Sequence, residues 1–291
     1  MSLLKTKEPQ SAIQAIDSIL ELTDRYDVFL FDQWGVLHNG LQLYPKVNSL
    51  LSTLSTLGKT IIVLSNSGKS SSINQDRLRD MGLSSSLTTN LVTSGDVARW
   101  AFDSEHKKVT RFINQSLLWL DSSAGEVEAI YQHLSKSKEN TSVVLAGIAE
   151  GITHQRYLDL LALMQQQNIP LLCINPDINR FTPQGILPST GFYAKTYEEQ
   201  GGVVSYIGKP DSLVYEYTLS HYQLKDPSRI VMVGDSIHHD VLGASNMGID
   251  SILLRRGIHQ SLFNRIPEEK LFSDWVKEGL ALPTYVMDEI A

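Results

Sequence analysis

Three short apolar runs in the chain each lead into a polar residue and a turn. The runs, with the polar residue that closely follows each, are Val28–Phe31 with Asp32, Ile61–Leu64 with Ser65, and Ile230–Val233 with Asp235. Apolar runs of this length between turn residues are typical of strands buried in parallel sheets. Since ligands bind beyond the carboxyl ends of such strands, we expect Asp32, Ser65 and Asp235 to share one edge of one sheet.

Helical patterns separate these runs from further strand-like segments. The predicted helices are residues 11–24, 45–58, 74–82, 94–103, 124–135, 153–167, 211–222 and 240–248. The further predicted strands are residues 108–114, 141–148, 169–175 and 250–257. Alternation of strands and helices is typical of α/β proteins. The sequence therefore predicts a doubly wound, Rossmann-like parallel-sheet core, with further α/β structure in the middle of the chain.

Length, charge and cysteine content limit the function. The 291 residues suit about two domains, and a net charge of −7 argues against partners such as nucleic acid or an anionic membrane. Cys173 is the one cysteine, so no intramolecular disulfide or cysteine-based zinc site can form, and its apolar neighbours predict a buried thiol. Neither an apolar stretch of ~18 residues nor a signal-peptide pattern is present, which favours a cytoplasmic protein.

Two more carboxylates follow the third apolar run. Asp235 and Asp240 lie five positions apart in "GDSIHHD", and with Asp32 they would form a site of hard oxygen ligands. Such a site suits Mg²⁺, which binds a few carboxylates together with substrate phosphate. The alternative for Asp240 is a helix N-cap, a position that aspartate favours. The adjacent pair His238 and His239 would point apart, so both are expected to be solvated or packed rather than to bind metal.

Two segments offer groups for phosphate. Ser65 in "LSNSG" supplies a hydroxyl and neighbouring backbone N–H groups, including that of Asn66, at a strand end. The segment is not a nucleotide-binding P-loop, because Val63 stands where that motif requires glycine. Lys209 in "GKPD" precedes a predicted helix, and its cation would keep a nearby carboxylate ionised and neutralise phosphate charge. The alternatives are a turn-forming serine and a surface lysine.

The order of "FDQWGV", "LSNSG", "GKP" and "GDSIHHD" resembles the four motifs of the haloacid-dehalogenase-like hydrolases. The segments "TSGDVARW" and "NPDINRFTPQGILPSTG" between the second and third motifs resemble the NagD-like and p-nitrophenylphosphatase-like branch, class IIA, with its large cap. The resemblance implies a discontinuous catalytic core, residues 1–86 and 196–291, and an inserted α/β cap, residues 87–195. It also suggests a homodimer formed through the cap.

The resemblance also implies a role for each motif residue. Asp32 would be the nucleophile that attacks phosphorus and becomes an aspartyl phosphate. Ser65 and Asn66 would bind the phosphoryl group, and Lys209 would steady both Asp32 and phosphate. The Mg²⁺ ligands would be Asp32, Asp235, Asp240 and the backbone carbonyl of Trp34.

Trp34 departs from the family pattern, because phosphatases of the family carry a second aspartate there as general acid and base. Indole cannot exchange a proton at neutral pH, and general acid–base catalysis contributes roughly 10²–10⁴ in rate. Three explanations remain open. His38 could supply the proton, the substrate could carry a good leaving group such as an acyl or enol phosphate, or the protein could bind a phosphorylated metabolite without turnover. A subgroup of class IIA members resembles this chain in carrying Trp at this position.

The segment "CINPD" follows an apolar run and faces the active site in the resembling branch. Asn175 and Asp177 are therefore candidate substrate-binding residues, with Arg180 as a weaker one, although Asn-Pro and Pro-Asp are also turn formers. The preferred function is a Mg²⁺-dependent phosphatase of a small, sugar-phosphate-like metabolite. The alternative is a phosphometabolite-binding protein that does not hydrolyse its ligand.

Overall fold

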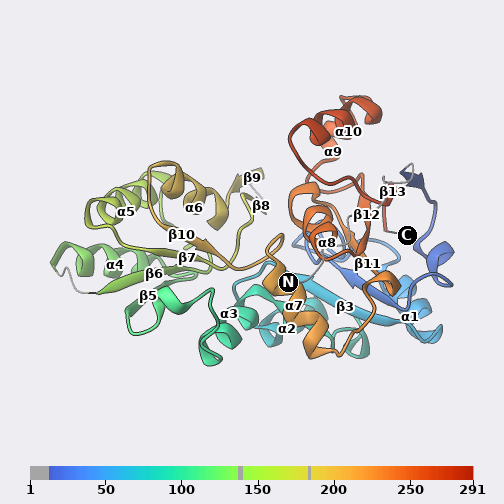
Figure 1. Cartoon of the computed structure of the whole chain (residues 1–291), viewed down its shortest axis with the longest axis horizontal. Helices are drawn as coiled ribbons and strands as arrows, with labels where there is room; N and C mark the ends of the chain where they lie inside the picture. The colour runs from blue at the N-terminus through green and yellow to red at the C-terminus, as the bar shows by residue number, and fades with distance from the viewer. Residues whose placement is uncertain (1–12, 137–139, 183–184, 291) are drawn as a thin grey trace, which may run out of the picture. The chain divides into compact units, whose positions relative to one another are not determined.

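The computed structural model describes residues 13–136, 140–182 and 185–290. The chain divides into two compact units (Figure 1). Unit 1 contains Met1–Leu64, Gln75–Leu91 and Tyr215–Ala291, and unit 2 contains Ser65–Asn74 and Val92–Val214. Among the described residues, no helix has the length and apolarity needed to cross a membrane.

The larger sheet has seven strands. In spatial order they are β1 (Gln14–Ala15), β13 (Tyr285–Met287), β12 (Asp250–Leu254), β11 (Ile230–Gly234), β2 (Val28–Phe31), β3 (Thr60–Ser65) and β4 (Leu91–Thr93). The pairings from β1 through β3 are parallel. Strands β2 to β4 run outward on one side of the β2–β11 pair, and β11 to β13 run outward on the other. This reversal of strand order is the topological switch point of a doubly wound sheet, so the predicted fold class is confirmed.

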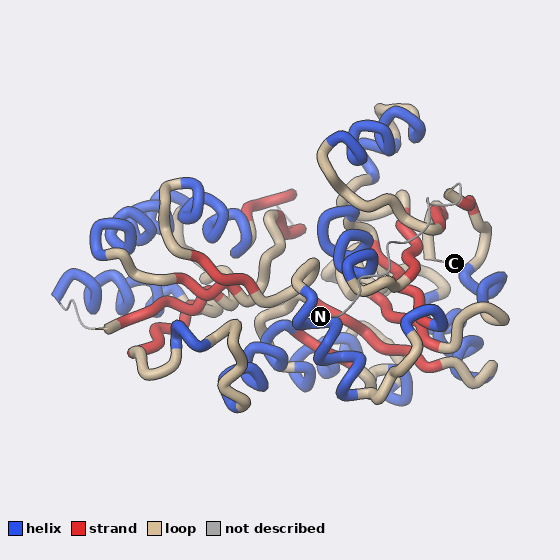
Figure 2. Tube along the Cα trace, in the orientation of Figure 1, coloured by secondary structure: helices blue, strands red, loops and turns tan. Residues whose placement is uncertain are grey.

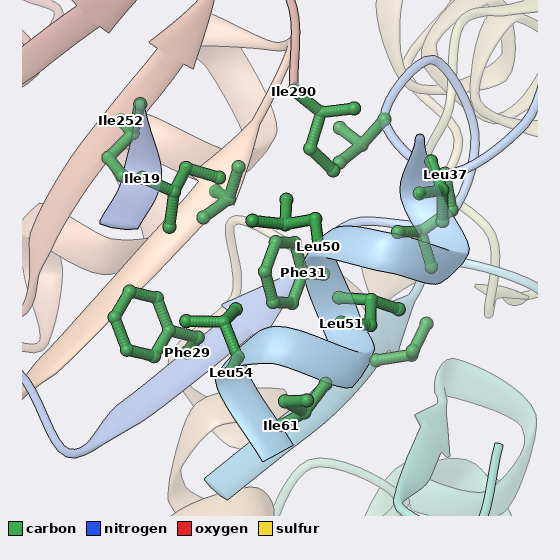
Figure 3. Packing of buried hydrophobic residues seen from close by; sticks show 14 of the residues in the cluster. Ile19, Phe29, Phe31, Leu37, Leu50, Leu51, Leu54, Ile61, Ile252 and Ile290 are labelled. Atoms are coloured by element: carbon green, nitrogen blue, oxygen red, sulfur yellow. The ribbon is translucent and has the colours of Figure 1, made fainter. Parts of the chain in front are cut away.

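Buried side chains on one face of this sheet hold α1 (Val47–Thr56) against it. Leu50, Leu51 and Leu54 of α1 pack with Phe29 and Phe31 of β2 in the core cluster shown in Figure 3. Their spacing along α1 places them on one helix face. Because β2 is buried along its whole length, the strand end that carries Asp32 is fixed by the core.

The remaining helices in the two terminal parts of the chain are short. They are α2 (Ser71–Asp80), α7 (Ser212–His221), α8 (Leu242–Asn246), α9 (Gln260–Phe263) and α10 (Glu268–Lys277), with a π-helical turn at Ile237–Val241 between β11 and α8. Phe272 and Trp275 of α10 pack against Ile237 and Val241 of this turn in a second apolar cluster. The π-turn is therefore held from behind by a helix near the C-terminus.

Unit 2 contains a four-stranded parallel sheet in the order β10 (Val204–Tyr206), β7 (Leu171–Cys173), β6 (Thr141–Leu145) and β5 (Ser116–Leu120). The helices α3 (Ser94–Asp103), α4 (Ala124–Lys136), α5 (His154–Gln167) and α6 (Thr190–Glu199) complete it, with an antiparallel hairpin of β8 (Asn179–Thr182) and β9 (Gly185–Pro188) (Figure 2). Residues from α4, α5 and α6 share one apolar cluster with the sheet. The cluster includes Cys173, which is buried as predicted.

Strand β10 lies outside the cap boundaries that the sequence suggests. The prediction assigns residues from 196 onward to the core, but β10 pairs with β7 and thus belongs to the smaller sheet. The predicted limits of the cap, residues 87–195, otherwise stay a prediction.

Two predicted elements are wrong. Residues 11–24 do not form a helix in their described part. Instead, Gln14 and Ala15 pair with β13, and a 3-10 helix, Ile19–Leu22, follows with Ser18 as its N-cap. Residues 108–114 do not form a strand but contain the 3-10 helix Thr110–Phe112. In both segments tertiary contacts determine the structure. In residues 11–24 the edge of β13 is available for pairing, and in residues 108–114 the side chain of Phe112 is buried although it lies in a turn.

Candidate functional site

Three predicted metal ligands meet in unit 1. Asp32 follows β2, Asp235 follows β11, and Asp240 lies in the π-turn; one carboxylate oxygen of each lies within 4.8 Å of the others. Asp235 and Asp240 are buried, with 4% and 1% of their surface exposed. Buried carboxylates repel one another strongly at such separations unless a cation or proton lies between them. The donor set of hard oxygens therefore fits a divalent cation such as Mg²⁺.

Backbone groups crowd around Asp235 and fix its position. The backbone N–H of Ile258 donates to Asp235 Oδ2 at 2.8 Å. A Cβ atom at Gly35 or at Gly257 would lie 2.0 Å from the same oxygen. Gly257 also has φ of +98°, a conformation that L-residues rarely adopt. The carboxylate is thus held between two loops that approach it closely at Gly35 and Gly257, where a side chain would not fit.

The π-turn places Asp240 beside Asp235. The N–H of Val241 donates to the carbonyl of Ser236, the five-residue spacing of a π-helix, and Ser236 N–H donates to Asp240 Oδ2 at 3.1 Å. The N-cap of the turn is Ser236, whose hydroxyl accepts from His239 N–H. The alternative interpretation of Asp240 as the N-cap is therefore wrong. π-Turns are frequent at functional sites, and this one directs a carboxylate toward the other two.

The indole of Trp34 is held by three neighbours in unit 1. The guanidinium carbon of Arg77 lies 4.9 Å from the ring centroid, and the ring of His38 packs edge-on at 4.9 Å. A Cβ atom at Gly40 would lie 2.3 Å from the indole, and Arg77 also donates to the Gly40 carbonyl at 3.1 Å. Trp34 therefore has a defined place in the loop after β2 and is an integral part of this site.

His38, the predicted proton donor, is fully buried. Its Nδ1 accepts from Gly40 N–H at 2.8 Å, and its Nε2 has no hydrogen-bond partner among the described residues. Burial, with a smaller contribution from the Arg77 charge, lowers the pKa of His38 to about 3. The imidazole is therefore neutral at physiological pH, which weighs against general acid catalysis by His38.

The predicted phosphate-binding residues form a second group in unit 2. Ser65 is buried at the end of β3, and its hydroxyl oxygen accepts from Ser67 N–H at 3.2 Å. This leaves the hydroxyl proton available as a donor. Lys209 is also buried, with 1% of its surface exposed. Asn66 joins this group, because its side-chain oxygen accepts from Lys209 N–H at 2.7 Å.

The predicted substrate-binding residues lie next to the same amide. Asn66 Nδ2 donates to Asp177 Oδ1 at 2.8 Å and to the Lys209 carbonyl at 3.3 Å. Asn175 Oδ1 accepts from Asp177 N–H at 3.1 Å, which closes a turn. Arg180 donates instead to the carbonyl of Pro188 in the β8–β9 hairpin. The structure thus brings Asn66, Lys209, Asn175 and Asp177 together in unit 2, and the roles assigned to them stay predictions.

Two residues that lie beside the site in unit 1 were not predicted from the sequence. Arg77 lies in the helix α2 and covers Trp34, and its spacing from Trp34 in the sequence gave no signal. Burial, with a smaller contribution from the negative charge of Asp235, raises the pKa of the Tyr44 hydroxyl, and the guanidinium carbon of Arg256 lies 5.0 Å from the centroid of its ring. A tyrosine twelve residues after Asp32 resembles any loop aromatic before the fold is known.

Two family models match separate segments of the chain, which together contain the predicted motif residues. A haloacid dehalogenase-like hydrolase model matches residues 29–120, and a HAD-hydrolase-like model matches residues 206–290. The first range contains Asp32 and Ser65, and the second contains Lys209, Asp235 and Asp240.

Individual relatives extend the similarity over most of the chain. A 4-nitrophenylphosphatase of Schizosaccharomyces pombe is 25% identical over 93% of this chain and 94% of its own length. The 5'-nucleotidase YutF of Bacillus subtilis is 25% identical over 80% of this chain and 88% of its own. The crystal structure of a haloacid dehalogenase-like family hydrolase from Brucella suis 1330 superposes with a TM-score of 0.76 at 26% identity, covering 95% of this chain and 100% of that one.

The chain belongs to the haloacid dehalogenase-like hydrolases. Within that family its relatives include 4-nitrophenylphosphatases, members of the class IIA branch that its motifs predicted.

Proposed function

We propose that the protein is a Mg²⁺-dependent phosphatase that hydrolyses phosphoric monoesters of small metabolites through an aspartyl-phosphate intermediate. Membership of a hydrolase family supports the reaction class. The observation that carries the proposal is the convergence of the Asp32, Asp235 and Asp240 carboxylates within 4.8 Å. Relatives named 4-nitrophenylphosphatase, acid sugar phosphatase and 5'-nucleotidase support a small phosphorylated substrate.

In the proposed reaction, Asp32 attacks phosphorus, the bond between phosphorus and the ester oxygen breaks, and the leaving oxygen takes a proton from solvent water to become an alcohol. Water then attacks the aspartyl phosphate, which releases inorganic phosphate and restores the Asp32 carboxylate. Ser65, through its hydroxyl, and Lys209, through its ammonium group, bind the phosphoryl oxygens. A divalent cation held by Asp32, Asp235, Asp240 and the Trp34 carbonyl would neutralise charge on the phosphoryl group.

Trp34 defines which substrates suit this site. It occupies the place of the second aspartate, and the neutral His38 beside it has a pKa of about 3. Neither residue can give a proton to a leaving alkoxide at neutral pH. We therefore expect rates to depend strongly on the leaving group, with acyl and enol phosphates hydrolysed faster than alkyl phosphates.

Phosphate release tests the proposal directly. Purified protein with Mg²⁺ is incubated with a panel of phosphorylated metabolites that includes acyl, enol and sugar phosphates. We expect release from at least one substrate, loss of activity on chelation with EDTA, and loss in Asp32→Asn. Asp274→Asn, which changes an exposed carboxylate paired with Lys277, is the matched control and should keep activity. A folded protein that releases no phosphate from the whole panel would contradict the proposal.

A second candidate function is binding of a phosphorylated metabolite without hydrolysis. The fixed position of Trp34 favours it, because the missing acid and base would cost roughly 10²–10⁴ in rate. In that case members of the panel would raise the melting temperature of the protein while no phosphate appears. The homodimer through the cap and the cytoplasmic location stay predictions from the sequence.

A further inference from the structure

The carboxamide of Asn66 connects two segments of unit 2 that are far apart in the sequence. Its oxygen accepts from Lys209 N–H at 2.7 Å, and its nitrogen donates to the Lys209 carbonyl at 3.3 Å. The same nitrogen donates to Asp177 Oδ1 at 2.8 Å. Both polar atoms of the amide are therefore engaged with protein, and 4% of the residue is exposed. These contacts do not favour a direct side-chain contact between Asn66 and phosphate.

The contacts to Lys209 fix its backbone on both sides of the residue. Asn66 pairs with the N–H and the C=O of the same amino acid, which leaves the backbone of residue 209 little rotational freedom. Gly208, just before it, lies so close to Pro176 that a Cβ atom would approach Pro176 Cδ to 2.5 Å. The loop that carries the lysine is thus packed against the loop that carries Asp177.

Asp177 is held from its other side by the start of α6. Gly191 N–H donates to the Asp177 carbonyl at 2.9 Å, and Thr190 donates to the carbonyl of Asn175. A Cβ atom at Gly191 would lie 2.0 Å from the Pro176 carbonyl oxygen. Backbone contacts therefore position residues 175–177, while the Asp177 carboxylate is oriented by the Asn66 amide.

We propose that Asn66 is a positioning residue whose amide links the Lys209 backbone to the Asp177 carboxylate, so that the phosphate-binding lysine and the substrate-binding aspartate are held as one element. This inference deepens the proposed function and rests on it. The link predicts that a change at Asn66 alters both turnover, through Lys209, and substrate affinity, through Asp177. It also predicts that the donor and acceptor of the 66–177 pair can be exchanged.

The test uses an exchange of amide and carboxylate in the full-length protein. Asn66→Asp keeps an acceptor for Lys209 N–H but sets a second carboxylate against Asp177. We expect kcat to fall by about 10²-fold, the size of effect that a small misplacement in an active site produces. Activity should recover partly at acid pH, because two adjacent carboxylates can share one proton. Asn264→Asp, which adds the same charge at an exposed position, should leave kcat and its pH profile unchanged.

The double variant Asn66→Asp/Asp177→Asn restores the pair with its polarity reversed. In it, the amide of residue 177 donates to the carboxylate of residue 66, which still accepts from Lys209 N–H, whereas the 3.3 Å hydrogen bond to the Lys209 carbonyl is not restored. We therefore expect kcat to rise by about tenfold over Asn66→Asp, short of the wild-type value, and the acid-side recovery to disappear, while KM stays raised because the substrate meets an amide instead of Asp177. A purely structural role would not produce this split between kcat and KM.

The outcomes separate the two proposals. If the wild-type protein releases no phosphate, the proposed function fails, and the link is then tested by the rise in melting temperature that inorganic phosphate produces. That rise should shrink in Asn66→Asp and return in the double variant. The inference is overturned if Asn66→Asp keeps the wild-type kcat, or, in an inactive protein, the wild-type phosphate response. It is also overturned if the double variant is no better than Asn66→Asp.

Discussion

Replacing Gly257 by alanine should disable the metal site without unfolding the protein. The new Cβ would lie 2.0 Å from Asp235 Oδ2 and 2.6 Å from Asp235 Cβ, so rotation of the carboxylate alone does not relieve the overlap. Asp235 must move, and the hydrogen bond from Ile258 N–H at 2.8 Å must break. A hydrogen bond to a charged group is worth about 1.5–3 kcal/mol. The positive φ of residue 257 adds about 1–2 kcal/mol for an L-residue.

Gly248→Ala is the matched control. Gly248 also has a positive φ, +69°, but a Cβ atom there meets nothing within 4 Å. The Gly248→Ala variant should therefore lose only the about 1–2 kcal/mol of unfolding free energy that the positive φ costs an L-residue. The difference in unfolding free energy between the two variants should thus be about 1.5–3 kcal/mol. In metal-free protein it should lie near the lower limit, because moving Asp235 away from Asp32 and Asp240 relieves their repulsion.

Thermal unfolding with and without Mg²⁺ measures the effect on the site. A cation that binds the folded state alone raises its stability with concentration, so the wild-type protein and Gly248→Ala should both melt at higher temperature as Mg²⁺ is added. Gly257→Ala should show no such rise and no phosphatase activity. If Gly257→Ala keeps the Mg²⁺-dependent rise of the wild type, Asp235 is not a ligand in the way the geometry implies.

Three further predictions concern Trp34, His38 and Cys173. Trp34→Asp should raise kcat for alkyl phosphates by up to about 10²–10⁴ in phosphate-release assays and should lower stability through loss of the Arg77 and His38 contacts; an unchanged kcat would show that proton transfer is not what the site lacks. Because the folded-state pKa of His38 is about 3, below its ordinary 6.5, the unfolded chain binds more protons between these values. The contribution of neutral His38 to the free energy of unfolding is complete above pH 6.5 and falls by about 1.4 kcal/mol per pH unit on acidification toward pH 3. In urea unfolding, the unfolding free energy of His38→Gln should lack this dependence on pH. The same dependence in wild type and variant would contradict the prediction. The burial that raises the pKa of the Cys173 thiol to about 12 should keep it unreactive toward a thiol reagent in the native protein and reactive in denaturant; rapid native labelling would argue against a closed cap core.

The strand ends of the core could be predicted from the sequence because burial on both faces leaves a clear signal. Val28–Phe31 and Ile230–Val233 are uninterrupted apolar runs, and the polar residues after them were the predicted metal ligands. The N-terminal segment misled for the opposite reason. Apolar residues at helical spacing around Ile16 and Ile19 become buried through pairing with β13, a partner about 270 residues away whose edge no local pattern reveals.

The site was harder to predict where it depends on contacts between distant segments. Asn66 was expected to bind phosphate because of its place in a motif, which stays a prediction for its backbone N–H, but its side-chain amide is engaged with Lys209 and Asp177. His38 was expected to titrate near neutral pH because imidazole does so in water, and burial removes that property. For both residues the side-chain type shows which interactions are chemically possible, whereas the surrounding residues determine which of them occur in the folded protein.

The π-turn at Ile237–Val241 constrains how this part of the gene can change. It carries one residue more per turn than an α-helix, and that extra residue sets the direction in which Asp240 points. Deleting a single residue from "IHHDV" would let a regular helix form, yet it would rotate Asp240 by about 100° around the axis. Substitutions can therefore accumulate at the exposed His238, but we expect the number of codons between Ser236 and Leu242 to be invariant.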